Sequence, residues 1–479
     1  MRDARFDWGR ACARVAKANL VRSLGKVTKV VGLVVEAVGQ EAFIGELCRI
    51  RSAGSHDVLA EVVGFHGETL LLMPLGEIHG IRPGSEVVAV GRPFEVPVGR
   101  SMLGRVVNGL GHPIDGKAPM EIEARCSVHR HPPAPMTRAP IIEPLATGIR
   151  VIDGLLTCGK GQRVGIFAGS GVGKSTLLGM IARYTEADVN VIALVGERGR
   201  EVREFIAREL GEEGLRRSVV VVATSNEPSL LRRQAAFVAT AIAEYFRDQG
   251  KHVLLMMDSL TRFALAQREI GLSVGEPPTT RGYPPSAFAM LPGLLERAGT
   301  ADHGGSITGL YTILVEGDDM NEPVADHARA ILDGHIVLTR ELAERNHYPP
   351  VDFLGSVSRL MSAVAPPEMR GAAAKLRELL AAHRQAQDLI NIGAYVSGSN
   401  PKVDEALRYM TRIEAFLRQS PDERPDFAGT AEQLIALFAP EVGAEATPRR
   451  KRPDPRAEAS YLNAASMTRT GTAATHVVA

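Results

Sequence analysis

The sequence predicts an α/β protein in which a central domain with a mostly parallel sheet lies between a small N-terminal β-barrel and a C-terminal helical domain. Short Val- and Leu-rich runs punctuated by glycine recur over residues 27–95, which is typical of a barrel. From about 146 to 365, apolar runs alternate with helical patterns, and this alternation favours parallel βαβ units. From 366 to about 439, apolar residues recur at helical spacing.

Length and composition indicate a soluble globular protein of several domains. The chain has 479 residues, which corresponds to roughly three domains. Its 56 basic and 55 acidic residues nearly cancel, so the net charge does not point to nucleic acid or to an acidic partner. The four cysteines lie far apart, without metal-ligand spacing. We therefore expect reduced, buried thiols, no membrane span, no secretory signal and a cytoplasmic location.

The two ends of the chain differ from the rest in composition. Residues 1–26 carry arginines and lysines between apolar side chains, a pattern that predicts a basic amphipathic helix. Such a helix either packs on its own domain or docks on an anionic membrane or a partner protein, and the pattern leaves both open. Residues 440–479 are rich in Ala, Thr, Pro and Arg and poor in large apolar residues, which predicts a disordered tail.

Between these ends we expect three domains. The barrel takes 27–95, the central domain 96–365 and the helical domain 366–439. The central domain contains apolar runs that we interpret as buried strands, and these lie at 164–167, 189–195, 219–223, 253–257 and 311–315.

A glycine-rich segment at 168–175, with the sequence AGSGVGKS, follows the first of these strands. Glycines let a backbone fold tightly around a phosphate, and the helix that follows adds its positive end. Lys174 would reach the β- and γ-phosphates and Ser175 would bind Mg²⁺. Ala168 stands where the strict pattern has glycine, so a chance glycine-rich turn is the alternative. The predicted nucleotide-binding residues are Gly169, Ser170, Gly171, Val172, Gly173, Lys174, Ser175 and Thr176.

Two acidic residues follow other predicted strands. Asp258 ends the apolar run 253–257, and P-loop enzymes place an acid for the Mg²⁺ site in this way. Glu197 follows the run 189–195, where it would point into the site and handle the attacking water. Many strands end in Asp, and a solvated charged turn is the alternative for Glu197. With the glycine-rich loop, these acids predict a site for ATP and Mg²⁺.

These motifs together resemble the catalytic subunits of rotary ATPases and, more closely, the type III secretion ATPases. The resemblance covers roughly residues 25–438, and its matching segments are 167–178, 196–204, 257–268, 275–283 and 348–361. It implies a RecA-like P-loop ATPase core. Within this group the sequence is most similar to the flagellar export ATPases, through 216–225, 258–285 and 388–395. Injectisome ATPases share most of these segments and are the alternative.

The resemblance also implies roles for particular residues. Glu197 would be the general base with Arg198 beside it, and Asp258 would hold a water ligand of Mg²⁺. Arg262 would lie near the phosphates. Tyr348 matches the aromatic residue that stacks on adenine, and Arg359 matches an arginine finger that enters the neighbouring subunit's site. A finger of this kind is worth roughly 10³–10⁵ in rate.

For the whole protein, the resemblance implies a homohexamer that hydrolyses ATP to release and unfold export substrates. The implied partners are a stalk protein, a regulator on the N-terminal helix, export chaperones and a membrane export gate. The protein would then be peripheral at the cytoplasmic face of the inner membrane.

Two hypotheses from other functional classes are alternatives to an export enzyme. A non-catalytic rotary ATPase subunit would lack the acid at the position of Glu197, so its presence argues against that reading. A hexameric nucleic-acid motor also joins a small barrel to this fold. A strand-binding barrel should carry exposed aromatic residues and a basic groove, whereas residues 27–95 have Phe43, Phe65 and Phe94 as aromatics and no dense basic run. We therefore expect no nucleic-acid partner.

Overall fold

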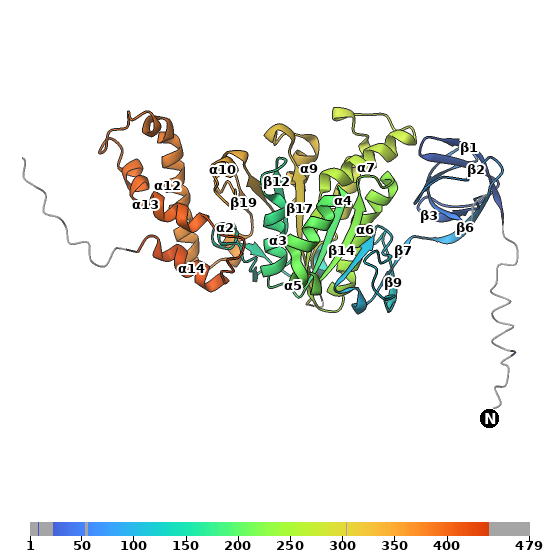
Figure 1. Ribbon diagram of the computed structural model, residues 1–479, viewed down its shortest axis with the longest axis horizontal. Coiled ribbons are helices and arrows are strands. Elements are labelled where there is room, and N and C mark those ends of the chain that lie inside the picture. The colour runs from blue at the N-terminus through green and yellow to red at the C-terminus, as the bar shows by residue number, and fades with distance from the viewer. Residues whose placement is uncertain (1–7, 9–22, 53–55, 303, 440–479) are drawn as a thin grey trace, which may run out of the picture. The chain divides into compact units, whose positions relative to one another are not determined.

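The computed structural model describes Trp8 and residues 23–52, 56–302 and 304–439 (Figure 1). Most of the predicted amphipathic helix at 1–26 lies outside these residues, and its last two, Gly25 and Lys26, begin the first strand. The predicted tail at 440–479 also lies outside them. The compact unit described below ends at Leu437.

The N-terminal domain is a closed barrel in which the strands follow the order β1-β2-β5-β4-β3-β6. Neighbouring strands are antiparallel. Apolar side chains from all six strands, such as Val27, Val62 and Leu72, form a buried cluster inside, as expected for a sheet with one face exposed to water. The six strands are β1 Gly25–Val31, β2 Val34–Val38, β3 Glu46–Ile50, β4 Val58–His66, β5 Thr69–Pro74 and β6 Glu86–Pro93. The predicted barrel is therefore confirmed.

The central domain contains a nine-stranded sheet. Eight of its strands follow the order β19-β18-β12-β17-β15-β13-β14-β8, and the ninth, β16, pairs with β17 outside this order. The strands from β18 to β8 run parallel to one another, whereas β16 and β19 are antiparallel. The strands are β8 Arg105–Asn108, β12 Arg163–Ala168, β13 Val189–Glu197, β14 Ser218–Thr224, β15 His252–Asp258, β16 Gly299–Thr300, β17 Ser306–Leu314, β18 Gly334–Leu338 and β19 Val357–Ser358. The predicted parallel α/β core is confirmed.

Helices connect these strands, and several of them pack on the sheet (Figure 1). Their bounds are α2 Arg150–Leu155, α3 Lys174–Tyr184, α4 Gly199–Glu204, α5 Gly211–Arg216, α6 Ser229–Arg247, α7 Leu260–Ser273, α8 Pro285–Leu295, α9 Pro323–Ile331 and α10 Arg340–Glu344. A π-helical segment, η3 Phe205–Leu210, joins α4 to α5. Helix α6 packs on β13, β14 and β15 and is buried along almost its whole length. It contains many alanines, whose small side chains let the helix lie close to the sheet.

Shorter elements complete the central domain. Two small ribbons pair β7 with β9 and β10 with β11. Their bounds, with those of the 3₁₀ turns, are β7 Glu95–Val98, β9 Ala124–Ser127, β10 Pro144–Leu145, β11 Cys158–Gly159, η1 Arg100–Met102, η2 Pro135–Thr137, η4 Thr280–Gly282 and η5 Glu316–Asp318.

The C-terminal domain is helical, as predicted. Its helices are α11 Met361–Val364, α12 Pro367–Asn391, α13 Pro401–Leu417 and α14 Phe427–Ala436. Both α12 and α13 begin with proline, whose missing N–H costs nothing in the first turn. Side chains of Asn400 and Asp426 accept hydrogen bonds from the free N–H groups at the starts of α13 and α14. Among the described helices, none combines the length and the apolar character that crossing a bilayer needs.

A buried ion pair ties α6 to the chain that leaves α8. Arg297 forms a fork with Glu244, with both N···O distances at 2.8 Å, and its remaining nitrogen donates to the carbonyl oxygen of Val128 at 2.6 Å. Both charged side chains are 1% exposed. Arg130 Nη1 lies further off, 3.6 Å from Glu244 Oε2, so breaking the pair leaves the buried Glu244 without its two charge-assisted hydrogen bonds.

We predict that Arg297→Met lowers the free energy of unfolding by about 3 kcal/mol, because the buried Glu244 then loses both hydrogen bonds to the guanidinium and keeps only the more distant Arg130. Replacing both residues, with Glu244→Leu added, should restore part of this loss. Urea-induced unfolding followed by circular dichroism measures both. The control is Arg200→Ala, which removes an exposed pair with Glu204 and should change stability by less than about 0.5 kcal/mol. An equally small effect of Arg297→Met would contradict the prediction.

Candidate active site

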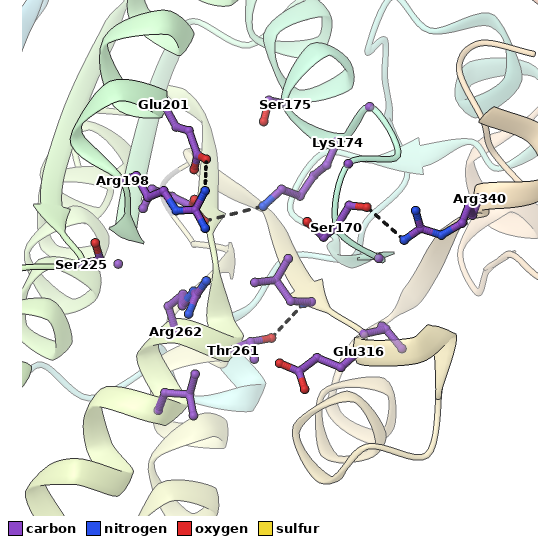
Figure 2. Close-up of a pocket in the computed structure, with 18 of the residues that line it drawn as sticks. Ser170, Lys174, Ser175, Arg198, Glu201, Ser225, Thr261, Arg262, Glu316 and Arg340 are labelled. Carbon is purple, nitrogen blue, oxygen red and sulfur yellow. Dashed lines mark hydrogen bonds and ion pairs between the residues drawn. The ribbon is translucent and has the colours of Figure 1, made fainter. Parts of the chain in front are cut away.

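A cavity of about 810 Å³ opens where the parallel strands end (Figure 2). Parallel strands present their carboxyl ends at one edge of a sheet, so the turns that follow them converge there. The cavity is lined by turns after β12, β13, β14, β15, β17 and β18. The lining residues used below are Gly169, Ser170, Gly171, Gly173, Lys174, Ser175, Thr176, Gly196, Glu197, Arg198, Glu201, Ser225, Thr261, Arg262, Leu314, Glu316 and Arg340.

The glycine-rich loop connects β12 to α3 and ends on the first turn of this helix. Gly171 and Gly173 have φ angles of +77° and +98°, which glycine adopts without strain and other residues avoid. Gly173 is the N-cap of α3. The first N–H groups of a helix lack partners within it and attract anions. The loop therefore has the geometry of a phosphate site.

The predicted binding residues do not all face the cavity in the same way. All of 169–176 except Val172 line it. Val172 is 1% exposed and belongs to the core. The hydroxyl group of Thr176 donates to Glu209 Oε1 at 3.2 Å, and the Ser170 carbonyl oxygen accepts a hydrogen bond from Arg340 (Figure 2).

Three charged side chains meet beneath the loop. Lys174 Nζ lies 2.5 Å from Asp258 Oδ1 and 3.8 Å from Glu197 Oε1. Asp258 and Glu197 end β15 and β13, which are neighbours in the sheet. All three side chains are largely buried, so their charges are poorly screened by water. The structure thus brings together the lysine and both acids that the sequence singles out.

The pKa of Glu197 is raised to about 7. Burial is the larger cause, and the nearby Asp258 carboxylate adds to it, while Lys174 and Arg262 act in the opposite direction. A carboxyl group with a pKa near neutrality can both accept and return a proton at the working pH, which is what a general base needs.

Arg262 lies on the first turn of α7 and packs against Gly196. A Cβ at Gly196 would lie 2.9 Å from the Arg262 Cβ, so glycine leaves room for the arginine there. Within the described part of the chain, Arg262 Nε is buried and has no hydrogen-bond partner. A guanidinium with an unused donor on a cavity wall fits an anionic ligand. Arg198 is largely exposed and pairs with Glu201 at 3.4 Å (Figure 2).

Tyr348 and Arg359, like Asp258 and Val172, are not among the residues that line the cavity. Tyr348 is 42% exposed and borders the loop, with its Cε1 3.4 Å from the position that a Cβ at Gly173 would take. Arg359 follows the edge strand β19 and is exposed. Its Nη2 donates to the Arg329 carbonyl oxygen at 3.4 Å. Arg359 is therefore not part of its own chain's cavity.

Sequence reasoning missed several lining residues. Arg340 begins α10 directly after β18, and its Nη2 donates to the Ser170 carbonyl oxygen at 3.1 Å. Thr261 Oγ1 accepts a hydrogen bond from Leu314 N at 2.9 Å, and Glu316 follows β17. The rule that places ligands at strand ends would have indicated Arg340 if β18 had been predicted, since the arginine stands two residues after that strand.

The oxygen donors at the site suit Mg²⁺ held together with a nucleotide. Ser175 lines the cavity with its hydroxyl group, and the Asp258 carboxylate lies beside Lys174. Over the described ranges, no group of three or more His, Cys, Asp and Glu side chains is arranged to hold a metal ion. Mg²⁺ commonly takes one or two protein oxygens and completes its shell with phosphate oxygens and water. These residues therefore fit a P-loop nucleotide site.

Family models match three successive parts of the chain. Residues 27–91 match the β-barrel domain of the ATP synthase alpha/beta family, and 148–358 match its nucleotide-binding domain. Residues 365–436 match the C-terminal domain of the type III secretion ATPase EscN.

Individual proteins are similar over nearly their whole length. The flagellum-specific ATP synthase of Bacillus subtilis is 57% identical over 88% of this chain and 95% of its own. The type 3 secretion system ATPase of Xanthomonas euvesicatoria is 51% identical over 87% of this chain and 94% of its own. A solved structure of the assembled ATPase EscN from enteropathogenic E. coli superimposes with a TM-score of 0.82 at 46% identity, covering 86% of this chain and 99% of that one. A structure of assembled EscN with its central stalk EscO has a TM-score of 0.80.

The fold and the cavity define a P-loop nucleotide-binding enzyme. The chain belongs to the type III secretion and flagellar export ATPases, within the ATP synthase alpha/beta family. It is an ATPase that hydrolyses ATP.

We predict that Lys174→Ala abolishes ATP hydrolysis, with a loss of roughly 10²-fold or more, and weakens nucleotide binding, because the loop loses its side-chain cation. Steady-state turnover and titration with a fluorescent ATP analogue measure the two effects. The control is Lys251→Ala at the opposite edge of the sheet, where Lys251 lies 3.9 Å from Asp188, and it should keep normal activity. Turnover of Lys174→Ala within about threefold of the unsubstituted enzyme would show that this loop is not the catalytic one.

Proposed function

We propose that this ATPase energises protein export by a flagellar type III system, through release and unfolding of export substrates. The observation that carries this proposal is that two flagellum-specific relatives are 57% and 54% identical to this chain, whereas the type 3 secretion system relatives of Xanthomonas euvesicatoria and Sinorhizobium fredii are 51% identical. Other flagellum-specific relatives are 47–51% identical, so an injectisome ATPase is the alternative. The match of residues 365–436 to the EscN C-terminal domain supports an export role in either case.

Within the cavity, the proposed roles follow from charge and position. Lys174 and Arg262 bind the phosphates, and the loop 169–173 supports them with backbone N–H groups. Ser175 and Asp258 hold Mg²⁺, Asp258 through water, and this ion neutralises charge on the phosphates when bound. Glu197 accepts the proton of the attacking water, with Arg198 beside it. The raised pKa of Glu197 supports this assignment.

Two residues at the border of the site are assigned to contacts with the base and with a second subunit. Tyr348 stacks on adenine, since its ring borders Gly173 on the exposed side of the loop. Arg359 serves a neighbouring subunit as an arginine finger. Its exposure directly after the edge strand β19, outside its own cavity, supports a role in trans. We infer a homohexameric ring with one site at each boundary, a proposal consistent with the assembled state of EscN.

The proposed partners are those that an export ATPase requires. The complex of EscN with EscO supports a central stalk protein for this chain. A regulator on the N-terminal helix, export chaperones and a membrane export gate complete the set. The enzyme would then act at the cytoplasmic face of the inner membrane as a peripheral protein.

We predict that Glu197→Gln binds ATP normally but hydrolyses it at least about 10²-fold more slowly, because the amide keeps the shape and loses the basicity. Cells in which this variant replaces the native protein should fail to export flagellar subunits and should not swim.

Loss of injectisome secretion with normal motility would move the assignment to the alternative system. Hydrolysis stimulated by RNA, with export unaffected, would favour a nucleic-acid motor instead. If Glu197→Gln hydrolyses ATP at the native rate, another residue must accept the proton of the attacking water.

The finger in trans predicts rescue between two inactive variants. Arg359→Ala should bind ATP and be nearly inactive, with a loss of roughly 10³-fold, because no site receives a finger. Lys174→Ala subunits keep the finger and lack a working loop. A mixture should be more active than either variant alone, because some boundaries join an intact loop to an intact finger. Turnover of the mixture against total protein concentration measures this.

The control for the mixing experiment is the doubly substituted chain, Lys174→Ala with Arg359→Ala. Mixed with Arg359→Ala it supplies no finger, so it should give no rescue. Absence of rescue in mixed rings whose assembly is verified by light scattering would contradict the shared site.

A further inference from the structure

Strand β17 lies between β12, the strand that leads into the phosphate loop, and β15, the strand that ends in Asp258. In the sheet it pairs with β12 on one side and with β15 on the other. Nearly all of its side chains are buried, so a hydroxyl group on it that lacks a hydrogen-bond partner carries an energetic cost. Within the described residues, the buried Tyr311 hydroxyl group has no such partner, whereas those of the serine and the threonines on this strand do. Ser306 Oγ lies 2.9 Å from His252 Nδ1, and Thr308 Oγ1 accepts from Gly161 N at 2.8 Å. Both contacts lie near the amino end of the strand, away from the cavity.

Thr312, near the carboxyl end of β17, makes a different contact. Its side chain is completely buried, and its Oγ1 donates to Asp258 Oδ1 at 2.7 Å. The Met257 carbonyl oxygen is also near, but at 3.4 Å it is the weaker acceptor. Valine has nearly the same shape and suits a buried strand equally well. The hydroxyl group is therefore what distinguishes threonine at this position, and its partner is the acid.

The same oxygen of Asp258 also contacts Lys174. Lys174 Nζ and Thr312 Oγ1 both lie within 2.7 Å of Oδ1, one from the loop and one from the sheet. Neither contact uses Oδ2. Two residues further along β17, Leu314 N donates to Thr261 Oγ1. Strand β17 thus contacts both Asp258, the last residue of β15, and Thr261, in the first turn of α7, the helix that carries Arg262.

We propose that Thr312 is a positioning residue that fixes the Asp258 carboxylate for Mg²⁺. The inference rests on the proposed role of Asp258 at the metal. Before nucleotide binds, the carboxylate is held by both Lys174 and Thr312. Once the phosphates attract Lys174, the hydroxyl group of Thr312 is the side-chain donor that still orients Oδ1. Removal of such an outer partner typically weakens metal binding about 10-fold to 100-fold.

The test compares Thr312→Val, which removes the hydroxyl group, with Thr312→Ser, which keeps it. Equilibrium binding of a fluorescent ATP analogue is followed while Mg²⁺ is titrated, so that the readout does not depend on turnover. For Thr312→Val we expect the Mg²⁺ concentration at half-saturation to rise about 10-fold, with unchanged binding of the analogue in the absence of Mg²⁺. Thr312→Ser should restore the native Mg²⁺ requirement.

Thr308→Val is the matched control, because it removes a buried hydroxyl group from the same strand at the far end from the cavity. It should lower the melting temperature and leave the Mg²⁺ requirement unchanged. An unchanged requirement in Thr312→Val would overturn the proposal. So would an equal loss of analogue binding with and without Mg²⁺, because that result means a general structural role.

Asp258→Asn separates this inference from the function on which it rests. If this variant keeps the native Mg²⁺ requirement, the proposed role of Asp258 is wrong, and the role of Thr312 is wrong with it. If Asp258→Asn raises the requirement and Thr312→Val does not, the role of Asp258 stands and the assignment of Thr312 alone is overturned.

Discussion

The active site depends on one buried lysine that lies between two carboxylates. Lys174 offsets the charges of Asp258 and Glu197, which end neighbouring strands and are largely shielded from water. Without a cation between them, two acids so placed would not both ionise near neutral pH. The pKa of Glu197 is raised chiefly by burial, and the Asp258 carboxylate adds to this, while Lys174 and Arg262 act against it. The site thus holds two acids and two cations largely out of water beneath a loop that attracts anions.

Because Lys174 already contacts Asp258, nucleotide binding would replace one partner of this lysine by another. An incoming triphosphate would compete with Asp258 for Lys174, and the cost of leaving the acid unpaired would then require a second cation. Under the proposed function, Mg²⁺ provides it. The protein residues do not form a metal cage by themselves over the described ranges, so Mg²⁺ would depend on phosphate oxygens of the nucleotide to complete its shell. Arg262, with its unpartnered Nε, adds positive charge on the same wall.

Features that depend on neighbouring residues in the sequence were predictable, and those that depend on strand order were not. The phosphate loop is contiguous in the chain, so its glycines and its lysine identify it by their spacing alone. The five apolar runs correspond to β12, β13, β14, β15 and β17. The short strands β8 and β18 lack a long apolar run and were missed, and Arg340 was missed with β18.

The contact of Thr312 with Asp258 shows more clearly what a local sequence pattern cannot predict. This threonine stands inside a strand that the sequence predicts, but its partner is set by the position of β17 between β12 and β15. No local pattern encodes that order, because it results from how the crossover connections pack. The finger role of Arg359 is implied by the family resemblance alone and stays a proposal, because the residue lies exposed outside its own chain's cavity. The N-terminal helix and the tail remain predictions, since they lie outside the described residues.

The way the cavity wall is assembled has a consequence for biosynthesis. Ser170 and Arg340, which meet across the loop, are 170 residues apart in the chain. At the usual rates of translation, roughly 10–30 s separate the emergence of these two segments from the ribosome. During that interval the loop exists without the rest of its wall, so ATP has no complete site on the nascent chain. ATP can stabilise the finished domain by binding only the native state, but it cannot guide the domain to that state. Partly synthesised chains must therefore depend on their own packing, or on general chaperones, until β18 joins the sheet.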